Sequence, residues 1–284
     1  MAINIHSIIQ NIDTLTPIPA IANKIMAIAS DPEGALSDLA DVLQYDAELT
    51  ANLLKMCNST YTGLTVKVDS ARQAISLLGM DRVLEMVLLA NTSKNMLRAQ
   101  QGYGLARGEL WKNSVATALL SKAIATDKKN IDKFRVYTAS LIKDIGKVII
   151  ESYVGRFIQR IQNLVDKKGY SFDQAEETIL GIDHAKLGGM IAEKWNFSSK
   201  MIFMIRNHHL SRAAARSDVE TAIVYLADTV SRMVGIGIGA DGLAYKVYED
   251  IFDNLGVSEK ELQCFTSDFQ LYLNKAEQLL ISLN

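Results

Sequence analysis

The stretch Ala139-Ser-Leu-Ile-Lys-Asp-Ile-Gly-Lys-Val-Ile-Ile150 places two adjacent charged residues, Lys143 and Asp144, inside an otherwise apolar run. Burying charges in an apolar environment is costly unless they are paired, hydrogen-bonded or bound to a metal. We therefore expect this apolar helix to lie in the core of the protein. The charged pair within it should have a structural or a chemical role.

Helix start signals recur on both sides of this stretch. Ser70 with Gln73, and Ser171 with Gln174, make the spacing of a capping box, in which each side chain satisfies a backbone N–H of the other. Asp183 is placed to cap a third helix, which carries the next apolar face. These local signals predict helices that begin close to residues 71, 172 and 184.

The rest of the chain also favours helices over strands. Residues 83–90 are almost wholly apolar and predict a central, buried helix. Asp46 can cap a helix that carries Leu49 and Leu53 on one face. Alternating, strand-like runs are scarce, and residues 64–68 form the best candidate for a strand. We predict an all-α fold, a multi-helix bundle with an amino-terminal helical subdomain.

Glycine-rich and arginine-rich segments suggest where the chain divides. We expect an amino-terminal helical half over residues 1–100, a second helical half over 101–230, and a carboxy-terminal helical extension over 231–284. Residues 235–239, Gly-Ile-Gly-Ile-Gly, could be mistaken for a phosphate-binding loop. They follow a predicted helix and lack the accompanying Lys-Ser/Thr pair, so a helix connection is favoured.

Composition narrows the class of protein. Of the 284 residues 49% are hydrophobic and 22% are charged, with a net charge of −2, which argues against a dedicated nucleic-acid binder. Two cysteines, Cys57 and Cys264, suggest reduced thiols and no disulfide framework. We see neither a signal peptide nor an apolar run of about 18 residues that could span a bilayer. We expect a cytoplasmic protein with no membrane contact.

Histidine and aspartate residues supply the candidate chemistry. The four histidines are His6, His184, His208 and His209. Asp228, like Asp144, interrupts an apolar helical stretch, and His and Asp converging from separate helices can build a metal site. Adjacent histidines point about 100° apart on a regular helix, so the pair at 208–209 can equally mark a helix end. Spacing alone leaves both interpretations open.

Several separate motifs carry a resemblance to a known family. They are Leu15-Thr-Pro-Ile-Pro-Ala20, Asp38-Leu-Ala-Asp-Val-Leu-Gln-Tyr-Asp-Ala-Glu-Leu-Thr50, Leu54-Lys-Met-Cys-Asn-Ser59, Ala74-Ile-Ser-Leu-Leu-Gly79, Leu110-Trp-Lys-Asn-Ser-Val-Ala116, Leu141-Ile-Lys-Asp-Ile-Gly-Lys147, Gly181-Ile-Asp-His-Ala-Lys-Leu-Gly188 and Asn207-His-His209. In this order, over roughly residues 14 to 230, the chain resembles the HDOD family, the HD-related output domains of bacterial signalling proteins. The resemblance implies an HD-like helical fold.

The resemblance also implies where a catalytic site would lie. The HDOD family is related to HD and HD-GYP metal phosphohydrolases, whose metal-binding histidines correspond to Asn113 and Lys143 here. The remaining ligand positions are matched by Asp144, His184, His208, His209 and Asp228. Asparagine offers a weak amide oxygen and a protonated lysine offers no lone pair, so both substitutions weaken a metal site. We therefore expect a pseudo-enzyme with no catalytic residue and no cofactor.

The predicted function follows from this degenerate site. We expect Asn113, Lys143, Asp144, His184, His208, His209 and Asp228 to form a buried polar network. The family implies a regulatory signal-transduction module that acts through contacts with a signalling protein. One alternative is a metal-dependent phosphohydrolase, with a residual divalent metal held by Asp144, His184, His208, His209 and Asp228. A second alternative is a sensor that binds a nucleotide without cleaving it.

Overall fold

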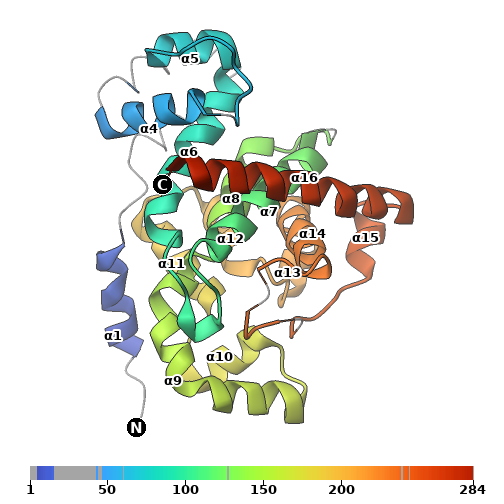
Figure 1. Cartoon of the computed structure of the whole chain (residues 1–284). Coiled ribbons are helices and arrows are strands. Elements are labelled where there is room, and N and C mark those ends of the chain that lie inside the picture. Colours follow the sequence, from blue (N-terminus) through green and yellow to red (C-terminus); the bar gives the residue numbers. More distant parts are fainter. Residues whose placement is uncertain are drawn as a thin grey trace.

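The structure is a computed structural model that describes residues 5–15, 43, 47–59, 61–126, 128–237, 239–242 and 244–283. Over these residues the regular structure is helical and contains no strand, which confirms the all-α prediction. In Figure 1, α4 and α5 lie at one end of the molecule and α9 and α10 at the other, while α16 crosses the bundle between them. In this part of the chain no helix combines the length and apolarity needed to cross a bilayer.

The helices fall into three successive groups. The first is α1 (Ile5–Gln10), the 3-10 helix η1 (Asn11–Thr14), α4 (Ala47–Cys57), α5 (Ala71–Leu78) and α6 (Met80–Met96). The second is the 3-10 helix η2 (Gln101–Tyr103), α7 (Glu109–Thr126), α8 (Lys133–Ile142), α9 (Ile145–Lys168), α10 (Phe172–Leu180), α11 (His184–Lys194) and α12 (Ser199–Asn207). The third is α13 (Ala213–Arg216), α14 (Val219–Met233), α15 (Asp250–Asn254) and α16 (Glu259–Leu283).

The predicted helix starts are confirmed. Ser70 caps α5 by accepting from the Gln73 N–H, and the Ser171–Gln174 pair forms a full capping box at the start of α10. Asp183 caps α11 by accepting from the Lys186 N–H. The predicted central helix is also confirmed, since residues 83–90 are buried throughout within α6. The proposed cap at Asp46 lies outside the described residues.

Residues 64–68, the best candidate for a strand in the sequence, do not form one. The segment is irregular. The backbone of its last residue, Val68, is hydrogen-bonded to a side chain and not to a neighbouring strand. The Asn58 amide donates to the Val68 carbonyl and accepts from the Val68 N–H, both at 2.8 Å. One asparagine thus satisfies both backbone groups that a strand partner would have satisfied.

The Lys143-Asp144 pair occupies a junction between two helices, and not the interior of one helix as we expected. α8 ends at Ile142, Lys143 is its C-cap, and Asp144 is the N-cap of α9. Helix α9 then continues with the Lys147 N–H donating to the Asp144 carbonyl. The apolar residues on either side are buried in the two helices, so the junction brings both charges into the core.

A glycine contact brings α9 close to α11. A Cβ atom at Gly146 would lie 2.0 Å from the His184 carbonyl oxygen and 2.9 Å from the Gly188 nitrogen. A Cβ atom at Gly188 would lie 3.3 Å from the Lys143 carbonyl oxygen. The two glycines therefore allow the α8–α9 junction to approach the first turn of α11.

Gly146→Ala should destabilise the protein by about 2–3 kcal/mol, because the new methyl group meets backbone atoms that cannot rotate away. Ser152→Ala, on the exposed side of the same helix, should change stability by less than about 0.5 kcal/mol. Urea unfolding of both variants measures the difference. Equal stability of the two variants would show that α9 and α11 are not in this close contact.

Candidate functional site

A cluster of buried charges surrounds the α8–α9 junction. The Lys143 side chain is 1% exposed, and its ammonium lies between the carboxylates of Asp144 and Asp228. It forms a short ion pair with Asp144 and lies 2.6 Å from Asp228 Oδ1. Asp228 comes from α14, so this single ammonium joins the junction to a residue more than 80 positions away in sequence.

Two further cations complete the pairing of these carboxylates. Lys147 Nζ, on the first turn of α9, lies 3.1 Å from Asp144 Oδ1 and 2.9 Å from Asp241 Oδ2. Arg232, one turn after Asp228 on α14, approaches Asp228 Oδ2 at 3.3 Å. Both carboxylates are thus held by two cations each.

These cations keep the carboxylates ionised. Burial alone would raise the pKa of Asp144, but Lys143 and Lys147 outweigh burial and hold that pKa well below its ordinary value. Burial would also raise the pKa of Asp228, and Lys143 with Arg232 lowers it. The acids therefore face the cations as charged carboxylates.

His184 is oriented by a buried glutamate. Its Nδ1 lies 2.6 Å from Glu176 Oε2, and the same oxygen accepts from the His184 backbone N–H at 3.1 Å. The other Glu176 oxygen accepts a short hydrogen bond from the Tyr103 hydroxyl. Burial lowers the pKa of His184, but Glu176 more than offsets it, so this pKa lies above its ordinary value.

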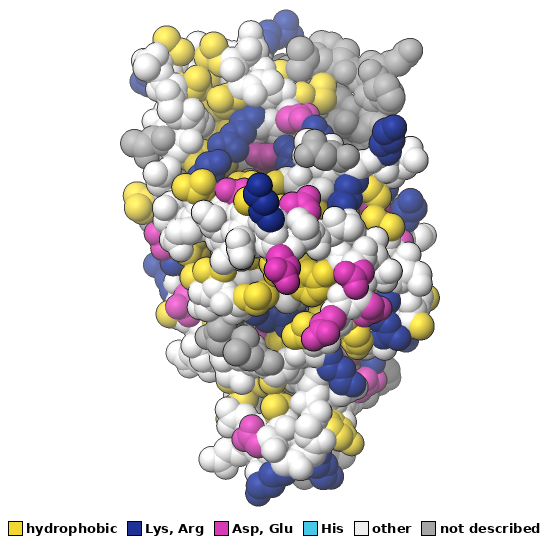
Figure 2. Space-filling view, turned by 90° about the vertical axis from the view of Figure 1, so that its right-hand side faces the viewer, with side chains coloured by type: hydrophobic (Ala, Val, Ile, Leu, Met, Phe, Trp, Pro, Cys, Tyr) yellow, Lys and Arg dark blue, Asp and Glu magenta, His cyan; other side chains and the backbone are white. Residues whose placement is uncertain are grey.

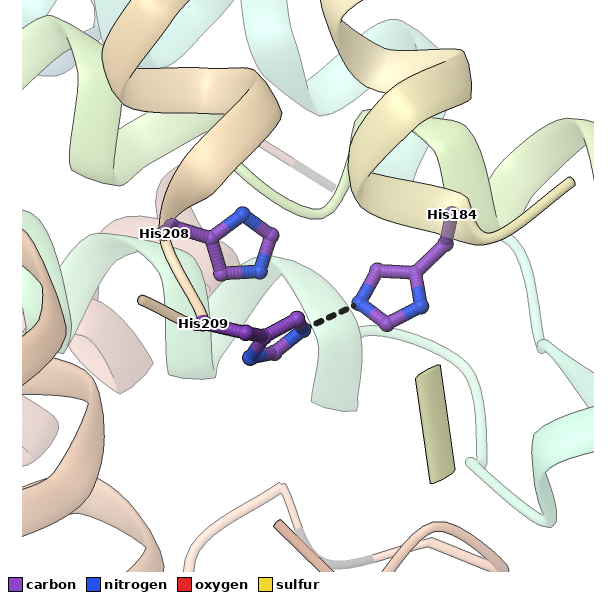
Figure 3. A group of neighbouring side chains, drawn as sticks. All are labelled: His184, His208 and His209. Atoms are coloured by element: carbon purple, nitrogen blue, oxygen red, sulfur yellow. Dashed lines mark hydrogen bonds between the residues drawn. The ribbon is translucent and has the colours of Figure 1, made fainter. Parts of the chain in front are cut away.

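His184, His208 and His209 converge, as Figure 3 shows. His184 opens α11, while His208 and His209 directly follow α12. His184 Nε2 and His209 Nε2 lie 2.8 Å apart, and the ring centroids of His208 and His209 are 3.9 Å apart. The His-His pair does mark a helix end, and because the helix ends there both rings can face His184.

His208 and His209 are held in the neutral form. Burial lowers the pKa of His208 to about 4, and burial lowers the pKa of His209 well below its ordinary value. His208 Nδ1 lies 2.9 Å from the Ile205 carbonyl and donates to it, so Nε2 carries the lone pair. That Nε2 faces Asp144 Oδ1 at 3.8 Å.

The structure brings together six of the seven residues predicted from the sequence. These are Lys143, Asp144, His184, His208, His209 and Asp228. Asn113 is directed elsewhere, because its amide donates to the Ser231 hydroxyl and, at 3.1 Å, to the Ile236 carbonyl. Asn113 therefore secures the chain that leaves α14.

Sequence reasoning missed six residues of the cluster. They are Tyr103, Lys147, Glu176, Arg232, Asp241 and Tyr245. Two of them follow a predicted acid by one helical turn, Lys147 after Asp144 and Arg232 after Asp228, and this spacing could have identified them. The other four reach the cluster through tertiary contacts.

The residues of the cluster fit a divalent metal only in part. The imidazoles fit, since ring nitrogens of His184, His208 and His209 lie within 4.8 Å of one another. The carboxylates do not fit, because Asp144 and Asp228 already hold the Lys143 ammonium. A divalent ion beside Asp144 would also face the charges of Lys143 and Lys147. The five-residue ligand set suggested by the sequence is therefore incompatible with these contacts.

Charge balance agrees with this conclusion. The cations Lys143, Lys147 and Arg232, together with His184, face the four carboxyl groups of Asp144, Asp228, Asp241 and Glu176. Each charged side chain of the cluster thus has an oppositely charged or hydrogen-bonding partner within it. A buried ion pair of this kind contributes little net stability, but removing one partner leaves an uncompensated charge.

Lys143→Met should destabilise the protein by about 3–5 kcal/mol, because it leaves both Asp144 and Asp228 without their shared cation. Lys186→Met removes a half-exposed ammonium that also pairs with two acids, and it should cost less than about 1 kcal/mol. Chemical unfolding at neutral pH compares the two. A Lys143→Met protein as stable as the Lys186→Met protein would refute the paired, buried ammonium.

Comparisons with known proteins concern the family and the fold of this chain. The HDOD domain family matches residues 15–211. An uncharacterized protein of Treponema pallidum is 23% identical over 206 residues, which cover 72% of this chain but only 39% of the length of that relative. Solved structures share the fold, and two of them are described next.

An HDOD domain protein of unknown function from Geobacter sulfurreducens has a TM-score of 0.70 at 23% identity, over 97% of this chain and 99% of its own. A proposed signal transduction protein from Marinobacter aquaeolei has a TM-score of 0.72 at 18% identity, over 98% of this chain and 64% of its own. At these identities the likeness concerns the fold. The family match covers more than half of the chain, and it places this protein in the HDOD family.

Proposed function

We propose that this protein is a non-catalytic regulatory module of a signalling system, which acts through contacts with a partner protein. The observation that carries the proposal is the Lys143 ammonium between Asp144 and Asp228. An ammonium in this place substitutes for the charge of a metal ion and offers no lone pair and no activated water. The cluster then serves to hold helices together.

The outer surface supports a role in protein contacts. The face drawn in Figure 2 shows apolar side chains interspersed with acidic and basic ones. Large apolar side chains are exposed in the carboxy-terminal part of the chain, among them Met233 at 58%, Val247 at 64% and Leu271 at 58%. Exposed apolar side chains of this kind are available for contact with a partner protein. That the protein is bacterial and that it lies in the cytoplasm are still predictions from the sequence.

Metal content and turnover test this proposal together. Protein purified without chelator should contain far less than one transition-metal ion per chain and should not hydrolyse a generic phosphodiester. The reason is that the two lysines on Asp144 exclude a divalent ion from the acids. Elemental analysis and a chromogenic phosphodiesterase assay provide the measurements. Stoichiometric metal with turnover that disappears in Asp144→Ala would contradict the proposal.

A metal-dependent phosphohydrolase is the second candidate, and one specific observation favours it. Glu176 and the Ile205 carbonyl each accept from an outward-facing histidine nitrogen, which turns the Nε2 atoms of His184 and His208 inward. Partners of this kind orient histidines that ligate metals. A solved structure of a proposed phosphohydrolase from Shewanella amazonensis also shares the fold, with a TM-score of 0.69 at 16% identity.

Lys143→His separates the two candidates. This change removes the competing ammonium and adds an imidazole, so it should create zinc binding that the unaltered protein lacks. Lys186→His, at a half-exposed lysine, is the matched control and should not bind zinc. Competition with a zinc-chelating dye measures the affinity. Equally tight zinc binding by the unaltered protein would favour the phosphohydrolase.

A further inference from the structure

A small cavity adjoins the charge cluster at His209. It lies between α10, the first turn of α11 and the turn that follows α12, and its volume is about 130 Å³. Pockets for drug-sized ligands measure about 300–1,000 Å³, whereas a cavity of about 150 Å³ admits benzene. The cavity therefore has room for a ligand of about the size of benzene, which is much smaller than a nucleotide.

The buried part of the cavity lining is polar. Asp173, Asp183 and His209 line it, and none of them is more than 8% exposed. Asp183 is satisfied, because it caps α11 and pairs with Lys186. Asp173 forms no ion pair within the described part of the chain, where it accepts one hydrogen bond, from the Ser211 hydroxyl at 3.1 Å. A buried carboxylate in this state favours a positively charged donor.

His209 offers a second unused group at the cavity. Its Nε2 lies 2.8 Å from His184 Nε2, the contact dashed in Figure 3. Its Nδ1 is buried and has no hydrogen-bond partner among the described residues. His184 Nδ1 donates to Glu176, so when both rings are neutral His184 Nε2 accepts from His209 Nε2, and His209 Nδ1 keeps its lone pair. An ammonium, with three N–H donors, suits a lone pair beside a carboxylate.

The exposed part of the lining carries a cation. Arg212 lies there, and no ion pair joins it to any residue that the structure describes. The other basic side chains of the lining are already paired, Lys186 with two acids and Arg206 with Glu193. The planar guanidinium of an arginine matches the geometry of a carboxylate. The cavity thus has an anion without an ion-pair partner in its buried part and such a cation at its mouth.

We propose that this cavity binds a small zwitterion of the α-amino acid class, with the ammonium at Asp173 and His209 and the carboxylate at Arg212. A ligand with one charge alone would leave one of these ends unpaired. Binding would join α10 to the segment that follows α12. The inference rests on the proposed function in one respect, since the amino acid would be the signal that the regulatory module passes to its partner.

Thermal unfolding with glycine, alanine and serine is the principal test. A saturating amino acid should raise the Tm of the unaltered protein by about 2–4 °C. Ethylamine and propionate each carry one of the two charges of alanine, and each should have a clearly smaller effect at the same ionic strength. No shift with any of the three amino acids would overturn the proposal. A shift with ethylamine or propionate as large as the shift with alanine would also overturn it.

Asp173→Asn tests the ammonium end of the site. The amide oxygen can still accept from Ser211 while the charge is lost, so the amino acid should bind about tenfold more weakly. Asp166→Asn, at an exposed acid of α9, is the matched control and should bind as the unaltered protein does. Isothermal titration calorimetry measures each Kd. Equal affinity of the two variants would refute the role of Asp173.

Arg212→Gln tests the carboxylate end, and it decides the matter if Asp173→Asn does not fold, because Arg212 is exposed. The variant should bind alanine about tenfold more weakly, since a charged hydrogen bond to the ligand is lost. Arg156→Gln, at an exposed arginine of α9, is the matched control. If Arg212→Gln bound alanine as tightly as Arg156→Gln, the zwitterion would be excluded.

Hydrogen exchange locates the ligand. A bound amino acid should slow exchange of the Ala175 and Ala215 amides, which close the first turns of α10 and α13. Binding by calorimetry without protection at either amide would place the ligand elsewhere and contradict the inference. All samples contain chelator. Absence of binding in this metal-free protein contradicts the amino acid site alone, whereas stoichiometric metal with phosphodiester turnover contradicts the proposed function and not the site.

Discussion

The ammonium of Lys143 holds together parts of the chain that are far apart in sequence. It neutralises Asp144 at the junction of α8 and α9 and Asp228 on α14. Neither carboxylate could stay charged in this core without a cation, and each has a second one, Lys147 or Arg232. The other side chains of the cluster surround these paired charges. Their roles follow from how each one satisfies a buried neighbour.

The pairing of Asp144 and Asp228 with Lys143 also bears on function. Carboxylates that hold ammonium groups cannot ligate a divalent ion in the same geometry, so the proposed function assigns these residues a structural role, in which they join helices. His184 still has the glutamate partner that would orient a metal ligand. Lys143, like Asn113, stands where the family resemblance implies a metal-binding histidine, and its ammonium offers no lone pair to a metal.

Much of the fold could be predicted from sequence because its signals are local. Ser70, Ser171 and Asp183 each act on backbone groups within three residues, and the structure confirms all three caps. The segment ending at Val68 was the best candidate for a strand, but its hydrogen-bond partner is the side chain of Asn58, which alternation of apolar residues does not reveal. Buried-charge and histidine patterns singled out six site residues, and the family resemblance grouped them into one site. Asp241 and Tyr245 could not be predicted, since their roles depend on where the chain after α14 returns.

A crystal structure of the protein grown with zinc, with anomalous data collected at the zinc edge, tests the central claim most directly. The account predicts no anomalous peak between Asp144 and Asp228 and a Lys143 Nζ within hydrogen-bond distance of both carboxylates. A peak about 2.0–2.2 Å from an oxygen of Asp144, with the Lys143 side chain turned away, would contradict it.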